Sequence, residues 1–544
     1  TALFATTTGA DCVAVGVYAL DANTTGGSNV AVGKQSLSTS TTLSGITAIG
    51  HQALNALTTG TGGVGVGYRA LKANTTGNNN TAVGYDAGLS LTTGGQNTVV
   101  GTLALDAATT ADSNTAIGYL ALSANTTANN NTALGRSTLA ANTTGAQNIA
   151  IGPYALDANT TADDNIAIGY DCLGENTTGA GNVAIGRNAL YANTTVSNLT
   201  AIGYMALNAN TTGTNGVAVG KDALQSNTTG DNNTAVGLEA LQTNTTGGSN
   251  TAGGTGALAL ATTANYNTAI GRAALGVLTT GGNNTSVGAL ALDACTTGDS
   301  NTCVGYNAGT AVTTGTNNTY IGFEAGKTNT ESSGNTAVGY QALQTHDSTS
   351  GEGYHYNTAI GGKAMHDADT AYSGTAVGYQ AMENAVDGYN NIAIGYQSAR
   401  NAFQSGTGHN NVIIGTNAGK SFTSATYNVA IGGKALEDAS TLDYTVAIGH
   451  ECMMNATTGS SNCVVGYYAA PLLTSGSDNT FIGTSCASTG VITSEKNVAV
   501  GKHALNDLVD GDNNVCIGYE AGGSITTSGS NICIGYRAGD ATSG

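Results

Sequence analysis

Histidine and acidic side chains gather in one short stretch of this sequence. His346, Asp347, Glu352 and His355 fall within ten residues, and imidazole and carboxylate groups are ligands that zinc takes from proteins. Their spacing matches no standard zinc motif, so the sequence predicts no metal and no cofactor. We expect loops here to bind a ligand, because loops on a rigid scaffold commonly carry binding residues. The candidate loop residues are His346, Asp347, Glu352, Tyr354, His355 and His409.

A second set of side chains that could bind a ligand recurs at one fixed position of a repeated motif. Tyrosine follows a glycine in many copies of a short motif, as in Gly118-Tyr119, and a cation takes its place in others, as in Gly135-Arg136. Because tyrosine and cations share this position, we expect it to reach solvent. Its aromatic rings could stack on sugars or simply cover a strand edge as an amphipathic stripe. The tyrosines are Tyr68, Tyr85, Tyr119, Tyr170, Tyr204, Tyr306, Tyr340, Tyr379, Tyr396, Tyr519 and Tyr536.

Composition and motif content exclude several classes of function. No nucleophile elbow, phosphate-binding loop or zinc-protease motif occurs, so we expect a protein that is not an enzyme. Fifteen Lys and Arg against 34 Asp and Glu give a net charge of -19, which excludes the basic surface that nucleic acids require. No run of 18 apolar residues occurs, so we expect no insertion into a membrane.

The elements that must position these side chains follow from an internal repeat. A Thr-Ala-Val/Ile-Gly motif ends in a glycine, here called the box glycine, that recurs 31 times from Gly16 to Gly535. Of the 30 intervals, 27 are 17 residues long, and the others are 22, 20 and 18. Seventeen residues are too few for a helix pair but suffice for one β-solenoid coil with two short strands and two turns. At about 4.8 Å per coil, the repeats predict a rod on the order of 150 Å long.

The strand pattern also suggests an assembly. Side chains alternate along a strand, so Ala133 and Leu134 should point to opposite faces. Both faces are then apolar, which indicates burial on both sides. We expect the larger residue to fill the coil and the alanine column to form a flat seam against another chain. The sequence thus predicts an all-β parallel solenoid assembled as a homotrimer. The alternative is that alanine is a small filler on a solvent-facing surface.

The repeat changes character along the chain. Residues 1–339 form a regular shaft of 17-residue repeats, and residues 340–544 continue the solenoid with loop insertions near 345–356 and 403–410. Nine cysteines are scattered over the chain without a Cys-x-x-Cys motif. Because several replace a small apolar residue of the repeat, we expect buried free thiols. Cys516 and Cys533, one coil apart, could alternatively be bridged.

An Asn-Thr-Thr turn recurs in many coils and has three interpretations. We favour a ladder in which the side-chain amides bond to neighbouring coils. Asn-Thr-Thr is also an acceptor sequence for N-glycosylation. A regular threonine array could bind ice, but adjacent threonines of an extended strand face opposite ways. The candidate turn asparagines are Asn23, Asn74, Asn125, Asn142, Asn159, Asn176, Asn193, Asn210, Asn227 and Asn244.

The repeat unit resembles a known pattern. The segments 79–88, 130–145 and 390–399 resemble the repeats of phage and prophage tail-fibre-like proteins, and are similar to the shorter repeats of YadA-like heads in trimeric autotransporter adhesins. The resemblance covers essentially the whole chain. It implies a left-handed parallel β-roll, a trimeric assembly and an extracellular binding or spacer role. The unit here is longer than the usual adhesin-head repeat, chiefly through the Asn-Thr-Thr turn.

We therefore expect a non-enzymatic extracellular fibre on a cell or virion surface. Its trimeric shaft would space or present an adhesive surface to a cell-surface glycan or receptor. One alternative is a purely structural filament or surface-layer component without a ligand, and another is an ice-binding solenoid. A fibre enzyme that cleaves polysaccharide would need carboxylates clustered in a groove, and the sequence does not reveal such a cluster.

Overall fold

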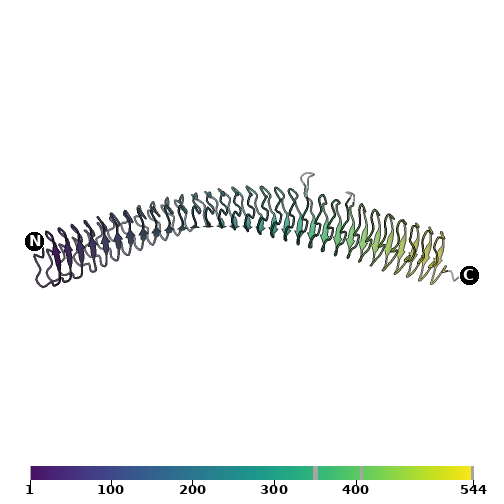
Figure 1. Ribbon diagram of the computed structural model, residues 1–544, viewed down its shortest axis with the longest axis horizontal. Helices are drawn as coiled ribbons and strands as arrows, with labels where there is room; N and C mark the ends of the chain where they lie inside the picture. The colour runs from purple at the N-terminus through teal and green to yellow at the C-terminus, as the bar shows by residue number, and fades with distance from the viewer. Residues whose placement is uncertain (1, 347–352, 405–407, 541–544) are drawn as a thin grey trace. The chain divides into compact units, whose positions relative to one another are not determined.

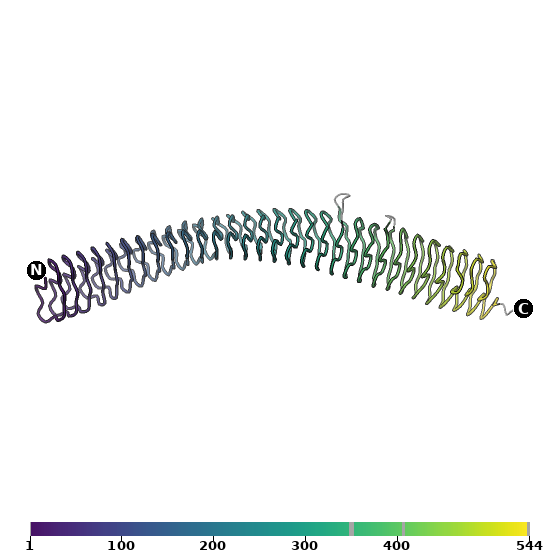
Figure 2. The backbone as a smooth tube through the Cα atoms, viewed as in Figure 1, coloured from purple at the N-terminus to yellow at the C-terminus, as the bar shows by residue number. Residues whose placement is uncertain are grey.

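The computed structural model describes residues 2–346, 353–404 and 408–540. The chain divides into two compact units, Thr1–Tyr266 and Asn267–Gly544. Each unit is a parallel β-solenoid in which every coil contributes one three-residue strand, and the described residues contain no helix (Figure 1). The backbone trace shows successive coils stacked side by side within each unit (Figure 2). The predicted all-β parallel solenoid with a 17-residue repeat is therefore confirmed. No helix among the residues described is long and apolar enough to cross a membrane.

The strands of the two units are short and uniform in length. Unit 1 contains β1 (Val13–Val15), β2 (Val30–Val32), β3 (Thr47–Ile49), β4 (Val64–Val66), β5 (Thr81–Val83), β6 (Thr98–Val100), β7 (Thr115–Ile117), β8 (Thr132–Leu134), β9 (Ile149–Ile151), β10 (Ile166–Ile168), β11 (Val183–Ile185), β12 (Thr200–Ile202), β13 (Val217–Val219), β14 (Thr234–Val236) and β15 (Thr251–Gly253). Unit 2 contains β16 (Thr268–Ile270), β17 (Thr285–Val287), β18 (Thr302–Val304), β19 (Thr319–Ile321), β20 (Thr336–Val338), β21 (Thr358–Ile360), β22 (Thr375–Val377), β23 (Ile392–Ile394), β24 (Val412–Ile414), β25 (Val429–Ile431), β26 (Val446–Ile448), β27 (Cys463–Val465), β28 (Thr480–Ile482), β29 (Val498–Val500), β30 (Val515–Ile517) and β31 (Ile532–Ile534).

Within each unit, every strand pairs in parallel and in register with the strand of the next coil. Ala116 pairs with Ala133, and Ala133 pairs with Ala150. The register survives the 22-residue interval, because Ala337 of β20 pairs with Ala359 of β21. The longer interval therefore leaves the register of the sheet unchanged.

In the residues that the structure describes, each coil contains only one of the two predicted strands. After the box glycine Gly118, Leu120 and Leu122 have left-handed φ values of 57° and 52°, and such residues cannot continue an extended strand. The segment is a run of turns that still bonds from coil to coil. The main-chain N–H of Leu122 donates to Thr138 O at 3.0 Å, and that of Ser137 donates to Tyr119 O at 2.8 Å. The prediction of a second strand was wrong because its leucines adopt a turn conformation.

The predicted directions of the strand side chains were also wrong. In every strand except β1 the central residue is buried, as Ala133 is in β8, while the flanking Leu134 is exposed. Leu122, from the turn after the box glycine, is buried inside the coil. Because leucines from the turns occupy the narrow interior, only a small residue fits at the strand centre. The alanine column therefore faces the core, and it forms no seam for another chain.

Core volume is balanced between the strand centre and the leucine of the turn. In β19 the strand centre is Tyr320, which is fully buried. The two turn positions that hold leucine in most coils are Gly309 and Gly326 around it, both with a φ of +60°. The same exchange accompanies the other large strand centres: Ile413 with Ala399 and Gly419, and Phe481 with Ala470 and Ala487.

A column of buried asparagines precedes the strands. The main-chain N–H of Asn114 donates to Asn97 Oδ1 at 2.9 Å, and Asn114 Nδ2 donates to Ala128 O at 3.0 Å. Each such amide therefore ties three segments of neighbouring coils together, and buried hydrogen bonds of this kind are costly to break. The repeat pattern alone did not predict this role for the asparagines.

The box glycines allow the coils to approach closely. Gly118 has a φ of +145°, and a Cβ built on it would lie 2.2 Å from Gly135 O of the next coil. No other residue fits such a contact. The spacing of the box glycines thus reports the coil length directly, which explains why the period could be determined from sequence.

Candidate functional site

The column of residues after the box glycines is exposed, as predicted. Tyr68, Tyr119 and Tyr204 are 42%, 47% and 43% exposed, and all the other tyrosines of this column are exposed as well. The strand ends at the box glycine, so each ring leaves the coil at the corner that follows the sheet. We call this set the post-glycine column.

Rings of the post-glycine column stack where aromatic residues occupy consecutive coils. In unit 1, Tyr68 lies between His51 and Tyr85, with ring centroids 5.2 and 5.1 Å away and planes within 12° of parallel. In unit 2, Phe323 lies between Tyr306 and Tyr340 at 5.6 and 5.5 Å. Such contacts contribute beyond burial alone.

A second aromatic column runs along unit 2 on the other side of the strands. It passes through five successive coils, with centroid distances of 5.1, 4.6, 5.2 and 5.2 Å between neighbours. Parallel backbone bridges hold the first three members in register. The residues of the second aromatic column are Tyr372, Tyr389, His409, Tyr427 and Tyr444.

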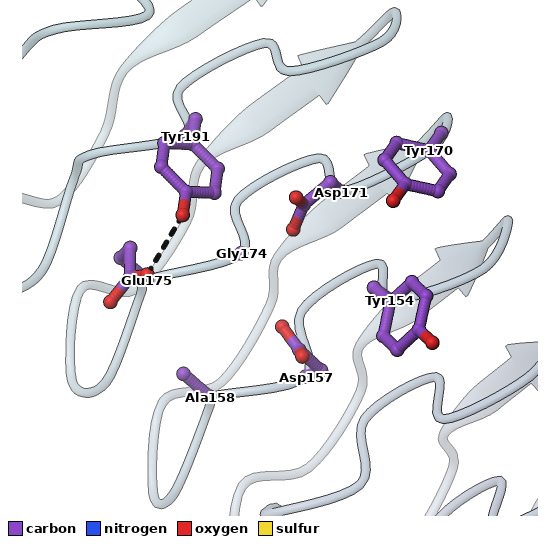
Figure 3. A pocket seen from close by; sticks show the side chains of 8 residues that line it. All are labelled: Tyr154, Asp157, Ala158, Tyr170, Asp171, Gly174, Glu175 and Tyr191. Atoms are coloured by element: carbon purple, nitrogen blue, oxygen red, sulfur yellow. Dashed lines mark hydrogen bonds between the residues drawn. The ribbon is translucent and has the colours of Figure 1, made fainter.

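A groove of about 360 Å³ lies between neighbouring coils of unit 1. We call it the acidic groove, because three carboxylates line it. Figure 3 shows Asp157 and Asp171 on adjacent coils, with the rings of Tyr154 and Tyr170 to one side and Glu175 and Tyr191 to the other. Tyr191 donates its hydroxyl hydrogen to Glu175 Oε1 at 3.0 Å. The lining residues are Tyr154, Asp157, Ala158, Tyr170, Asp171, Gly174, Glu175 and Tyr191.

A missing side chain opens the acidic groove. A Cβ built on Gly174 would lie 2.4 Å from Asp171 Oδ1 and 3.2 Å from Cε2 of Tyr191. In the coils on either side the equivalent position holds Asp157 and Tyr191. Glycine at this one coil therefore makes the space that the neighbouring side chains surround.

The carboxylates of the acidic groove perturb one another. Burial raises the pKa of Asp157 to about 6, and the negative charges of Asp171 and Glu175 add to the rise. Burial also raises the pKa of Asp171, with a further contribution from Glu175. The hydrogen bond to Glu175 raises the pKa of Tyr191. A carboxyl with a pKa of about 6 is partly protonated near neutral pH, and its protonated form can donate a hydrogen bond or act as a general acid.

No protein-family model matches this chain, and no curated protein matches it. The aromatic columns and the acidic groove are therefore the features that bear on function. The acidic groove supplies the cluster of carboxylates that a polysaccharide-cleaving fibre requires, and tyrosine rings beside carboxylates are also suited to binding sugars.

The predicted loop residues are only partly brought together. Asp347 and Glu352 lie outside the described residues. His346 is buried and hydrogen-bonds Ala368 O through Nδ1, and its ring lies 4.9 Å from that of His355. Burial lowers the pKa of His355.

Of the remaining loop candidates, Tyr354 is exposed and His409 is half-buried. Tyr354 is exposed, stacks on Tyr356 at 5.4 Å and lines a hollow of about 610 Å³ together with Glu331. His409 stacks on Tyr389 in the second aromatic column. Among the described residues, no group of three or more His, Cys, Asp or Glu side chains is placed to hold a metal ion.

The turn asparagines form the ladder that we favoured along two runs of coils, from Asn125 to Asn193 and from Asn210 to Asn244. Among the described residues, the side chain of Asn74 has no hydrogen-bond partner, and that of Asn23 bonds only within its own turn. Asn159 Nδ2 donates to Asn142 Oδ1 at 2.9 Å and to Ala162 O at 3.1 Å. A glycan on such a nitrogen would occupy the coil interior, so glycosylation is incompatible with this fold at every candidate. The candidates, all buried, are Asn23, Asn74, Asn125, Asn142, Asn159, Asn176, Asn193, Asn210, Asn227 and Asn244.

The two threonines of most Asn-Thr-Thr turns differ in exposure. Thr126 is half-buried and donates its hydroxyl hydrogen to Thr143 O at 3.1 Å, while Thr127 is exposed. The first hydroxyl thus belongs to the coil-to-coil bonding. The second threonine contributes to a solvent-facing column, and in the turns of Asn193 and Asn210 the first threonines, Thr194 and Thr211, are exposed as well.

Sequence reasoning found the post-glycine column but missed two other surfaces. A signal for the second aromatic column was present, because Tyr or His recurs five or six residues before consecutive box glycines between Gly378 and Gly449. The acidic groove had a weaker signal. Asp171 and Glu175 lie 14 and 18 residues after Asp157 in the sequence. Only the stacking of coils makes them neighbours of Asp157.

Proposed function

We propose that the protein is an extracellular fibre whose solenoid presents aromatic columns to a cell-surface glycan. The observation that carries the proposal is the second aromatic column, whose five rings follow one another on consecutive coils. In-register strands and buried asparagines hold these coils rigidly, so the rings are preorganised for binding. The post-glycine column places Tyr379 and Tyr396 on the same coils, across the strands.

The geometry defines how a sugar would contact these rings. Tyr389 has both faces covered, by Tyr372 and His409, whereas His409 and Tyr427 meet edge to face with their planes at 77°. The exposed ring edges and hydroxyl groups are therefore the contact surface, together with the free face at the end of a stack. Tyr444, at the end of the second aromatic column, is 63% exposed.

The fibre that we propose is a homotrimer of left-handed β-rolls, as the resemblance to adhesin heads implies. An apolar stripe on the outer face of the strands supports the assembly, since contiguous exposed apolar surface marks interaction sites. The alanine column cannot provide the interface, because it is buried. The exposed aliphatic residues of the stripe include Ile49, Val83, Leu134, Ile202 and Val236 in unit 1 and Ile270, Ile321, Ile360, Ile394, Ile448, Ile482 and Ile517 in unit 2.

A glycan-array measurement on the full chain tests the binding proposal. We expect binding to one glycan class, and we expect the double variant Tyr372→Ala, Tyr389→Ala to lose at least about tenfold in affinity, as loss of aromatic anchors does. Tyr119→Ala is the matched control, since Tyr119 is exposed but has Thr102 and Arg136 at its position in the neighbouring coils. No binding to glycans or cells would favour the structural filament instead.

Analytical ultracentrifugation tests the assembly. We expect a mass of three chains, and we expect the double variant Ile202→Lys, Val236→Lys to dissociate the trimer, because both side chains face outward on the strands. A monomer for the unaltered chain would contradict the proposed assembly.

The acidic groove favours a second candidate function, which is polysaccharide hydrolysis. Asp157, with a raised pKa, would act as the general acid. Release of new reducing ends from a polysaccharide panel tests this candidate. Loss of that release in Asp157→Asn would support it, and absence of release by the unaltered chain would exclude it for the panel.

A further inference from the structure

Tyrosines of adjacent coils form near-parallel pairs on the surface. In each pair the residues are 17 apart in sequence, the ring centroids are 5.1–5.7 Å apart and the planes are within 18° of parallel. Nine of the ten rings are exposed, and Tyr389 is half-buried. Among the described residues these pairs are Tyr68–Tyr85 in unit 1 and Tyr372–Tyr389, Tyr379–Tyr396, Tyr427–Tyr444 and Tyr519–Tyr536 in unit 2.

The thiols that would otherwise react with an oxidant are mostly hidden. Seven of the nine cysteines are buried, and only Cys12 and Cys463 are half-buried. Burial raises the pKa of Cys172, Cys452 and Cys486 to about 12. Since the thiolate is the oxidisable form, these groups are poor reductants in the folded chain.

Other oxidisable side chains are also scarce. The sequence has no Trp and only five Met. Met365, Met382 and Met453 are buried, and the other two are half-buried. The exposed tyrosines are therefore the most accessible one-electron donors on the surface of the described residues.

We propose that the stacked tyrosine pairs are sites of oxidative cross-linking to dityrosine, with a peroxidase and hydrogen peroxide as the oxidant. Each phenol loses one electron and its hydroxyl proton and becomes a phenoxyl radical. The two radicals join through a carbon–carbon bond between the ring carbons next to the hydroxyl-bearing carbons. The hydrogen on each of these carbons then moves to the phenol oxygen. Hydrogen peroxide accepts the two electrons and two protons and leaves as two molecules of water.

The stacking makes this coupling intramolecular. Both radicals of a pair are held on neighbouring coils at an effective concentration far above that of tyrosines on separate molecules. The bond formed between them closes a loop of one coil. Such a cross-link restricts the local opening of coils in the same manner as a disulfide restricts the unfolded chain.

Two tyrosines of the same column serve as internal controls. Tyr119 has Thr102 and Arg136 at its position in the neighbouring coils, and Tyr204 has Arg187 and Lys221. Both rings are exposed to a similar degree as Tyr68. They therefore report the reaction of an accessible tyrosine without a stacked tyrosine partner.

Peptide mass spectrometry of the oxidised full chain tests the proposal. The chain is treated with horseradish peroxidase and hydrogen peroxide at low protein concentration, then digested and searched for peptide pairs lacking two hydrogens. We expect links at the stacked pairs to exceed links at Tyr119 and Tyr204 by at least about tenfold. Tyr85→Phe should abolish the link to Tyr68 and leave the other four, whereas Tyr119→Phe should change none.

Two results would overturn the proposal. One is a yield at the stacked pairs no higher than at Tyr119 and Tyr204. The other is a yield that rises in proportion to protein concentration, because coupling would then occur between molecules. Neither result depends on glycan binding, so the test of dityrosine cross-linking is independent of the proposed function.

Discussion

The ring of Tyr320 fills the space that a side chain on Gly326 would need. A Cβ built on Gly326 would lie 2.6 Å from Cδ2 of Tyr320 and 2.7 Å from two further ring carbons. Tyr320 replaces the usual alanine of the strand centre, and Gly326 replaces the usual leucine of the turn. The interior of a coil thus has a nearly constant volume that two positions share, as close packing requires.

Gly326→Ala should destabilise the coils around β19. The added methyl collides with Tyr320 and also imposes a side chain on a φ of +60°, and we expect a loss of about 2–4 kcal/mol in local stability. Hydrogen exchange of amides 319–343 measures this loss, since long repeat arrays do not unfold in two states.

Gly256→Ala separates the two contributions to that loss. Gly256 has a φ of +67° but no atom within 4 Å of a built Cβ, so its substitution should cost only about 1–2 kcal/mol. The double variant Tyr320→Ala, Gly326→Leu restores the usual residues and should recover protection. Equal losses at Gly256 and Gly326 would show that Tyr320 does not crowd the turn.

Asn159→Ala should break the ladder of turn asparagines. Asn159 Nδ2 donates to Asn142 Oδ1, and Asn159 Oδ1 accepts from Asn176 Nδ2 at 3.3 Å. Buried amides that lose a partner cost about 1–3 kcal/mol. Hydrogen exchange should therefore accelerate in the coils 142–176.

The matched control for Asn159 lies in the same turn. Thr161 is exposed, so Thr161→Ala should leave exchange unchanged. Comparable acceleration in both variants would mean that the turn as a whole, and not the buried amide, is sensitive to substitution.

Asp157 should make the stability of unit 1 depend on pH. Its pKa in the folded chain is about 6, above the ordinary value of 3.8, so the folded state binds the proton more tightly. The free energy of unfolding should therefore fall as the pH rises from about 4 to about 6 and stay level above that. Hydrogen exchange of amides 152–176 at pH 5 and pH 7, corrected for the intrinsic pH dependence of exchange, measures this difference as a local free energy of opening.

Asp157→Asn should remove that pH dependence and stabilise the groove at pH 7. Asp231 provides a contrast of opposite sign, because hydrogen bonds from Thr214 lower its pKa. Its contribution should be lost as the pH falls, and Asp231→Asn should weaken the chain at pH 7. An unchanged pH profile in Asp157→Asn would contradict the assignment of the proton to this residue.

The period of the repeat was predictable because the box glycines are physically irreplaceable. A Cβ on Gly118 would collide with the backbone of the next coil. Each coil therefore keeps a glycine at this position, and the glycines mark the coils in the sequence. The exposure of the post-glycine column was predictable for a similar reason, since Arg136 and Tyr119 share one position and a charged group requires solvent.

The side-chain directions were not predictable from the same pattern. Because side chains alternate along a strand, Ala133 and Leu134 point to opposite faces. Both residues are apolar, so the pattern does not tell which of them lies inside the coil. The decision depends on Leu122, whose left-handed φ turns it into the coil. Leucine rarely adopts that conformation, and only the stacked coils enforce it. The acidic groove was hidden similarly, since Asp157 and Asp171 meet only across coils.

The direction of the strand side chains is the claim on which the apolar stripe, the assembly and the core depend. Ala133→Cys and Leu134→Cys place a thiol on the two faces of β8, against a background in which seven cysteines are buried. Intact-mass analysis of the native chain after treatment with a maleimide counts the added labels. We predict one additional label for Leu134→Cys and none for Ala133→Cys. An additional label on Ala133→Cys, with none on Leu134→Cys, would place the alanines outside and contradict the account.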